Sequence, residues 1–140
     1  MRKSIEKLLC KQNNLTTTYF GTPLENVLPL IHSNWNKIKT DISHGSGNEL
    51  QSGKFNSIAS SSALGVNAFG VFYEPNNMTW PTIESEKFTN PIFEKKLSNG
   101  LRGTNPNLDV FFENGNNVLA IECKFLETLG QKKPNSQISI

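Results

Sequence analysis

The sequence predicts an α+β fold, in which N-terminal helices precede antiparallel strands. Apolar residues recur at helical spacing between residues 24 and 38, and again between residues 60 and 73. Two short apolar runs flank Asn114-Gly115, a dipeptide that favours the tight turn of a β-hairpin. A chain of 140 residues is long enough for one domain with a single core. We therefore expect residues 1–140 to form one domain.

The first predicted helical segment begins at a capping box. Thr22 suits the N-cap, Pro23 suits the first helical position, and Glu25 can reach back to the cap. Pro29 lacks the N–H that a helix interior needs, so we expect a kink or a split there. The apolar residues at helical spacing are Leu24, Val27, Leu28, Ile31, Trp35 and Ile38.

A polar loop and a second helix come next. Residues 43–53 are rich in Ser, Gly, Asn and His, a composition typical of loops. Residues 60–73 predict a helix in which Ser60 acts as a plain N-cap. The alternative is that Ser60, Ser61 and Ser62 contact phosphate at the helix start. Asn67 would lie near a site or bond to loop backbone, and residues 74–81 are expected to form a loop.

The two apolar runs beside Asn114-Gly115 give the clearest strand pattern. Because side chains alternate along a strand, Ala120, Glu122 and Lys124 should share one face. The opposite, apolar face consists of Leu119, Ile121, Cys123 and Phe125.

The register of this hairpin decides where Asp109 lies. If Asn114-Gly115 is the whole loop, Asp109 faces Ala120 and lies diagonal to Glu122. Diagonal neighbours on one face are about 7–8 Å apart, close enough for two carboxylates to share one ion. A loop one residue longer would move Asp109 to the other face.

The ionisable residues of the hairpin suit phosphodiester chemistry. The carboxylates of Asp109 and Glu122 are the hard oxygen ligands that Mg²⁺ prefers, and Mn²⁺ accepts the same ligands. Such an ion polarises a phosphoryl group and activates water for hydrolysis. The Lys124 ammonium can stabilise developing negative charge or orient the attacking water, and it offsets repulsion between the carboxylates. These residues therefore indicate a nuclease.

Asp109, Glu122 and Lys124 resemble the PD-(D/E)XK motif of the restriction-endonuclease-like nuclease superfamily. Residues 60–70 and 93–125 are similar to a bacterial family of predicted restriction endonucleases, so the resemblance covers roughly the second half of the chain. It implies a core of one helix, a three-stranded antiparallel β-meander, a further helix and a further strand. Asp109 and Glu122 would then be metal ligands, and Lys124 the catalytic lysine.

Glu94 enters through the same resemblance. It lies on the candidate first strand, residues 92–97, and matches the extra acidic metal ligand that some members use. The alternative is a charged edge strand that discourages aggregation. The chain departs from the named motif in having Leu108 rather than proline before the aspartate, with Pro106 earlier. The resemblance divides the chain into a helical part, residues 1–56, and a nuclease core, residues 57–140.

The C-terminal end of this core is expected to be incomplete. Only sixteen residues follow Lys124, and Gly130, Pro134 and Ser136 disfavour a long helix. The resembled fold has a helix and a strand there. Either residues 127–140 supply a minimal version or the chain is a fragment of a longer protein, and the fragment is favoured.

Composition permits nucleic-acid binding without requiring it, since the net charge is +2 and the pI about 8.6. There is no apolar run of signal-peptide or membrane-spanning length, and the two cysteines are far apart. A reduced, cytoplasmic protein is therefore expected. His32 and His44 have no partner at zinc-ligand spacing, whereas Lys54 and Arg102 are candidate phosphate contacts. The expected partner is DNA; the oligomeric state stays open, with a homodimer as one option.

Three functions remain open from sequence. The favoured one is a Mg²⁺-dependent endonuclease that hydrolyses DNA, in restriction or defence. The alternative is a non-catalytic DNA-binding or interaction module on a nuclease-like fold. The third is a structural domain in which Asp109 merely accepts backbone hydrogen bonds and Glu122–Lys124 is an ordinary surface pair.

Overall fold

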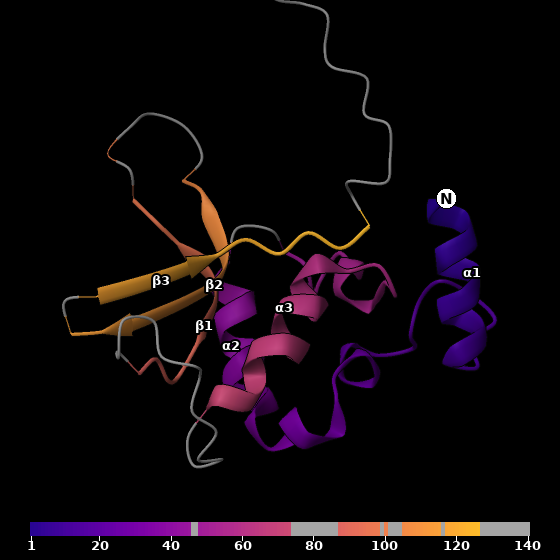
Figure 1. Ribbon diagram of the computed structural model, residues 1–140, viewed down its shortest axis with the longest axis horizontal. Helices are drawn as coiled ribbons and strands as arrows, with labels where there is room; N and C mark the ends of the chain where they lie inside the picture. The colour runs from indigo at the N-terminus through magenta and orange to yellow at the C-terminus, as the bar shows by residue number, and fades with distance from the viewer. Residues whose placement is uncertain (46–47, 74–86, 99, 101–104, 116, 127–140) are drawn as a thin grey trace, which may run out of the picture.

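Helices come first and strands follow in this protein (Figure 1). The computed structural model describes residues 1–45, 48–73, 87–98, 100, 105–115 and 117–126. The helices are α1 (Arg2–Gln12), α2 (Trp35–His44) and α3 (Ser61–Phe69), with 3₁₀ turns η1 (Pro23–Asn26), η2 (Pro29–Asn34), η3 (Lys54–Asn56) and η4 (Gly70–Phe72). The strands are β1 (Ile92–Lys96), β2 (Asn107–Asn114) and β3 (Asn117–Ile121), antiparallel in the order β1-β2-β3. The predicted α+β class is confirmed.

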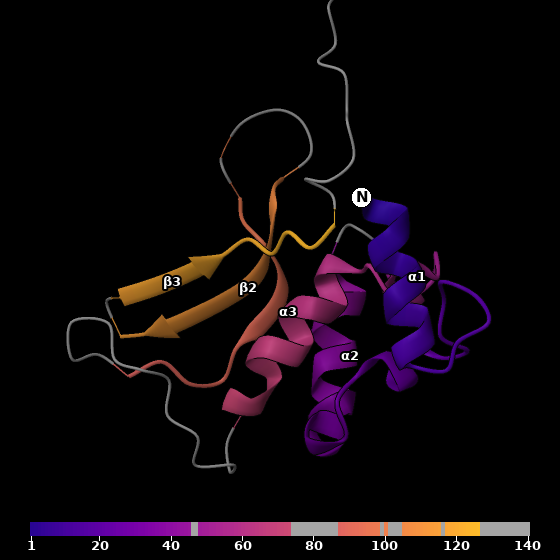
Figure 2. The ribbon, with the colours of Figure 1, turned by 45° about the vertical axis from the view of Figure 1, so that its right-hand side comes forward.

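Helices α2 and α3 pack against the sheet, and α1 lies beyond them. Helix α2 contacts β1, while α3 contacts both β1 and β2. In both views α1 lies at the opposite end of the molecule from the tip of the β2–β3 hairpin (Figures 1 and 2). Helix α1 contributes no buried residue. Within the described part of the chain, no helix has the length and apolar character needed to cross a bilayer.

The core between helices and sheet is aromatic. Phe112 of β2 is fully buried. Its ring makes edge-on contacts, with centroids 6.1 to 6.5 Å away, to Phe69, Phe72 and Phe88. Such contacts add about 0.5–1.5 kcal/mol each to the burial of the rings. This cluster fixes β2 against α3 and so positions the strand that carries Asp109.

Helix α3 is capped as its sequence predicts, but it ends at Phe69 and the 3₁₀ turn η4 follows, whereas the predicted helix runs to residue 73. The Ser60 hydroxyl accepts a hydrogen bond from the Ala63 N–H at 3.1 Å, which confirms the N-cap. Gly65 lets the helix approach the sheet closely. A Cβ at position 65 would lie 3.1 Å from the Cys123 sulfur and 3.2 Å from a Val110 methyl carbon.

The segment around Pro29 is split more strongly than the sequence pattern indicates. Thr22 caps η1 as predicted, accepting a hydrogen bond from the Glu25 N–H. Leu28 is extended, since a residue before proline avoids the helical region, and η2 starts at Pro29. An α-helix begins only at Trp35, and it runs to His44, into the predicted loop at 43–53. The predicted split at Pro29 is confirmed. The predicted helical run before Trp35 is replaced by two short 3₁₀ turns, one on each side of the split.

The register of the β2–β3 hairpin differs from the prediction by two residues. Phe111, not Asp109, pairs with Ala120, and Asn114 pairs with Asn117. The Asn114 side chain donates to the Lys87 carbonyl oxygen at 2.7 Å, which holds Asn114 in the ladder, and Gly115 takes the positive φ of +57°. A shift of two residues keeps every side chain on its predicted face. Cys123 is accordingly buried, while Ala120, Glu122 and Lys124 are exposed.

Candidate active site

The strand register places the three acidic residues predicted as metal ligands opposite one another on neighbouring strands. The register of β1 against β2 places Glu94 level with Asp109, between paired positions on either side. Continuing the β2–β3 register by one position brings Glu122 to the same level, just after β3 ends. The hairpin thus aligns Asp109 with Glu122 directly rather than diagonally.

Two of these three carboxylates line a polar cavity of about 460 Å³. The cavity lies between the sheet, the start of α3 and the loop before η3. The charged residues on its wall are Glu49, Lys54, Glu94, Asp109 and Lys124. Glu122 is not among the lining residues. The structure therefore brings Asp109, Lys124 and Glu94 to one cavity and leaves Glu122 outside its wall.

Glu94 is buried in an unusual backbone conformation. Its φ is +53°, in the left-handed region that residues other than glycine rarely adopt, and only 8% of its surface is exposed. It accepts a hydrogen bond from the Ser62 hydroxyl at 2.6 Å. Burial raises the pKa of Glu94, and the charges of Asp109 and Glu49 raise it further, against hydrogen bonds from Ser62 and Asn107. Glu94 is thus not itself a solvent-facing charge, although β1 lies at one edge of the described sheet and Lys96 on the same strand is exposed.

Asp109 ties the end of β3 to β2. Its Oδ2 accepts a hydrogen bond from the Cys123 backbone N–H at 2.5 Å. Such a backbone hydrogen bond is the structural alternative, predicted from the sequence, to a metal-ligand role for Asp109. Since a carboxylate has about four acceptor sites, the contact is compatible with metal ligation as well. Burial, and then the Asp109 charge, raise the pKa of the neighbouring Cys123 thiol to about 11, so this thiol stays protonated near neutral pH.

Glu122 and Lys124 form an ion pair with each other. Each side chain is about half exposed, at 51% for Glu122 and 52% for Lys124. Lys124 nevertheless lines the cavity of Glu94 and Asp109. Glu122 thus holds the Lys124 ammonium at the edge of this cavity. A metal-ligand role for Glu122 stays a prediction.

Glu49 is the acidic residue of the cavity that the sequence does not single out. Burial raises its pKa, the nearby Lys54 lowers it, and Asp109 raises it again. Its carboxylate lies 3.9 Å from the Lys54 ammonium. Glu49 belongs to no motif, and it sits in a segment whose composition indicates only a loop. No local signal could have found it.

The remaining candidates divide between the cavity and the scaffold. Lys54 and the serines at 60–62 line the cavity. Asn67 has the scaffold role, since it accepts from the Leu28 N–H and donates to the Asn26 carbonyl oxygen. Arg102, the predicted loop at 74–81 and the C-terminal residues 127–140 lie outside the described residues.

The donor set of the cavity suits a hard divalent cation. Glu94 and Asp109 supply carboxylate oxygens, and Glu49 lies close enough to shift the pKa of Glu94. Within the described ranges, no three His, Cys, Asp or Glu side chains are grouped closely enough to hold a metal ion by themselves. Mg²⁺ does not need three, because it commonly uses one or two carboxylates and completes its shell with water and phosphate oxygens. The pair of Glu94 and Asp109 therefore fits Mg²⁺.

Fold and site together define an α+β domain that presents paired carboxylates and a lysine around one polar cavity. Residues 10–139 match the family model described as restriction endonuclease associating with ARP, and the chain belongs to this family. The family description links the chain to restriction endonucleases. No curated protein and no solved structure matches the chain.

Proposed function

We propose that the chain is a Mg²⁺-dependent nuclease domain that hydrolyses phosphodiester bonds in DNA, in restriction or defence. The observation that carries this proposal is the placement of Glu94 and Asp109 at one level of the sheet and in one cavity with Lys124. Ionising Glu94 beside Asp109 is unfavourable, as its raised pKa indicates, and a bound cation would relieve that cost. The family's link to restriction endonucleases supports the same activity.

Each residue has a distinct role in this proposal. When bound, Mg²⁺ or Mn²⁺ would polarise the phosphoryl group and activate water. Asp109 and Glu94 would hold the ion, with their carboxylates oriented by the Cys123 N–H and the Ser62 hydroxyl. The Lys124 ammonium offsets negative charge that develops on the phosphate.

We further assign the chain to the PD-(D/E)XK superfamily, with Asp109, Glu122 and Lys124 as its motif. The family pattern makes Glu122 a metal ligand. The contacts favour a different role, because Glu122 lies outside the cavity wall and pairs with Lys124. We propose that Glu122 positions the lysine.

The change Glu122→Gln separates these two roles. If Glu122 positions Lys124, cleavage should fall about tenfold, as for residues that orient a ligand or catalytic group, while metal binding persists. Mg²⁺ should then raise the thermal unfolding midpoint of the variant as much as that of the native chain. Loss of this Mg²⁺-induced shift would instead assign Glu122 to the metal.

Plasmid cleavage by the full chain tests the proposed function. Supercoiled DNA should be nicked in Mg²⁺ or Mn²⁺ and left intact in EDTA. Lys124→Ala should lower the rate by roughly 10²- to 10³-fold, as expected for a group that stabilises developing charge. Lys39→Ala is the matched control, because Lys39 is exposed on α2 and does not line the cavity. Cleavage that survives EDTA or Lys124→Ala contradicts the proposal.

A non-catalytic binding or interaction module is the second candidate. The word "associating" in the family description favours it. Binding of DNA without cleavage in any divalent metal would support this candidate over the first.

A further inference from the structure

The net positive charge of the chain comes from α1. This helix has the basic residues Arg2, Lys3, Lys7 and Lys11 and the single acid Glu6, a net charge of +3. The whole chain carries +2, which leaves −1 for all residues outside α1. A phosphate polymer approaching the protein is therefore attracted mainly to this helix.

Three of these cations form one exposed row. Lys3, Lys7 and Lys11 are four residues apart and share one side of α1. The acid of the helix, Glu6, is bound to Arg2 at 2.8 Å. Across the described ranges, no ion pair is found for the three lysines. Since α1 buries no residue, the row is available to a partner.

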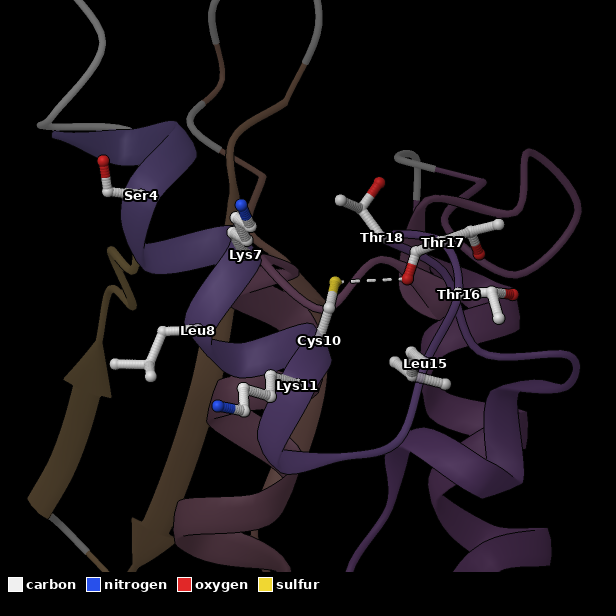
Figure 3. A pocket seen from close by; sticks show the side chains of 9 residues that line it. All are labelled: Ser4, Lys7, Leu8, Cys10, Lys11, Leu15, Thr16, Thr17 and Thr18. Carbon is white, nitrogen blue, oxygen red and sulfur yellow. Dashed lines mark hydrogen bonds between the residues drawn. The ribbon is translucent and has the colours of Figure 1, made fainter.

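A pocket of about 640 Å³ lies between α1 and the segment that follows it (Figure 3). Lys7 and Lys11 line it from the helix, and three consecutive threonines at 16–18 line it from the other side. The Cys10 thiol donates to the Thr17 carbonyl oxygen at 3.2 Å and ties the two sides together. Ammonium and hydroxyl groups are both donors to phosphate oxygens.

The threonine segment leads directly to the candidate active site. Tyr19, the next residue, lines the cavity of Glu94 and Asp109 and is bridged to Ser57, which also lines it. The Tyr19 side chain is 54% exposed at this point. The row on α1 is thus joined to the cavity wall by residues 12–19, which are exposed except for the partly buried Leu15.

We infer that α1 and residues 16–18 bind the sugar–phosphate backbone of the DNA whose scissile bond enters the cavity. This inference rests on the proposed function. The carboxylates of the cavity repel phosphate, and a bound cation offsets that repulsion only locally. The attraction that holds DNA must then come from another surface, and α1 carries more than the entire net charge. Contacts to the backbone confer affinity without sequence preference.

The experiment measures binding of a labelled DNA duplex in EDTA, by fluorescence anisotropy at several salt concentrations. The triple change Lys3→Gln, Lys7→Gln and Lys11→Gln should weaken binding about tenfold or more at about 50 mM salt, and flatten the salt dependence by about 0.9 per lost phosphate contact. Glutamine has nearly the helix propensity of lysine, so α1 should persist, and circular dichroism checks this.

The matched control removes the same charge elsewhere, through Lys39→Gln, Lys87→Gln and Lys96→Gln at exposed positions. It should leave the slope of the salt dependence near the native value. An equal loss of DNA affinity in both variants, or unchanged DNA affinity in the α1 variant, overturns the inference. Lysine-dependent binding by a chain that cleaves no DNA in Mg²⁺ keeps α1 as a DNA-backbone contact, but refutes both the proposed nuclease function and the entry of a scissile bond into the cavity.

Discussion

Replacing Asp109 by asparagine is expected to lower Mg²⁺-dependent cleavage by at least about 100-fold, because a catalytic cation contributes several kcal/mol to the transition state. Asparagine removes the charge and keeps an oxygen that can accept from the Cys123 N–H, so the end of β3 should be retained. A second measurement does not depend on activity. Mg²⁺ binding to the folded state should raise the unfolding midpoint of the native chain, and this shift should disappear in the variant.

Glu113→Gln is the matched control for Asp109→Asn. Glu113 lies on the same strand, is exposed and does not line the cavity. The control should cleave DNA at the native rate and retain the Mg²⁺-induced shift. Native cleavage by the Asp109→Asn variant, or an unchanged shift, would remove Asp109 from the metal site.

Local sequence rules predict the hairpin and α3 well because nearby residues determine them. Ser60 caps its helix through a bond to a residue three positions on, and Gly115 takes a positive φ in the turn. Alternation of apolar and polar residues then assigns the faces of β3. These features need no knowledge of the rest of the chain.

The features that sequence misses depend on contacts between distant residues. The register shift accompanies the bond of Asn114 to the Lys87 carbonyl, 27 positions away. Glu49 reaches the cavity through the folding of a loop that has no motif. The orientation of Glu94 follows from a left-handed φ and a bond to Ser62, 32 positions away. The hairpin pattern identifies Asp109 as a candidate and the family resemblance adds Glu94, but neither points to the Glu49 carboxylate in the same cavity.

Glu94→Gln is expected to change activity and stability in opposite directions. Glutamine keeps an acceptor for the Ser62 hydroxyl but cannot carry the charge that holds a cation. Cleavage should fall on the order of 100-fold, since the contribution of the ion is lost. In EDTA near neutral pH, however, the free energy of unfolding should rise, because burial and the charges of Asp109 and Glu49 disfavour the ionised form of Glu94 in the native chain, a cost that glutamine does not have. In saturating Mg²⁺ the native chain should instead have the higher free energy of unfolding, because the ion stabilises the native chain and not the variant.

The pH dependence of stability tests whether charge is the cause. Folding raises the pKa of Glu94 above its ordinary value of 4.5, so its contribution to stability is complete below that value and is lost as the pH rises through the folded pKa. Denaturant unfolding in EDTA should therefore show little difference between native chain and variant at acidic pH, and a growing advantage of the variant toward neutral pH. Glu49 has a raised pKa too, so the free energy of unfolding of the variant should still depend on pH, though less steeply than that of the native chain. An advantage that is the same at every pH would indicate packing rather than charge, and no advantage at neutral pH would mean that Glu94 ionises without cost.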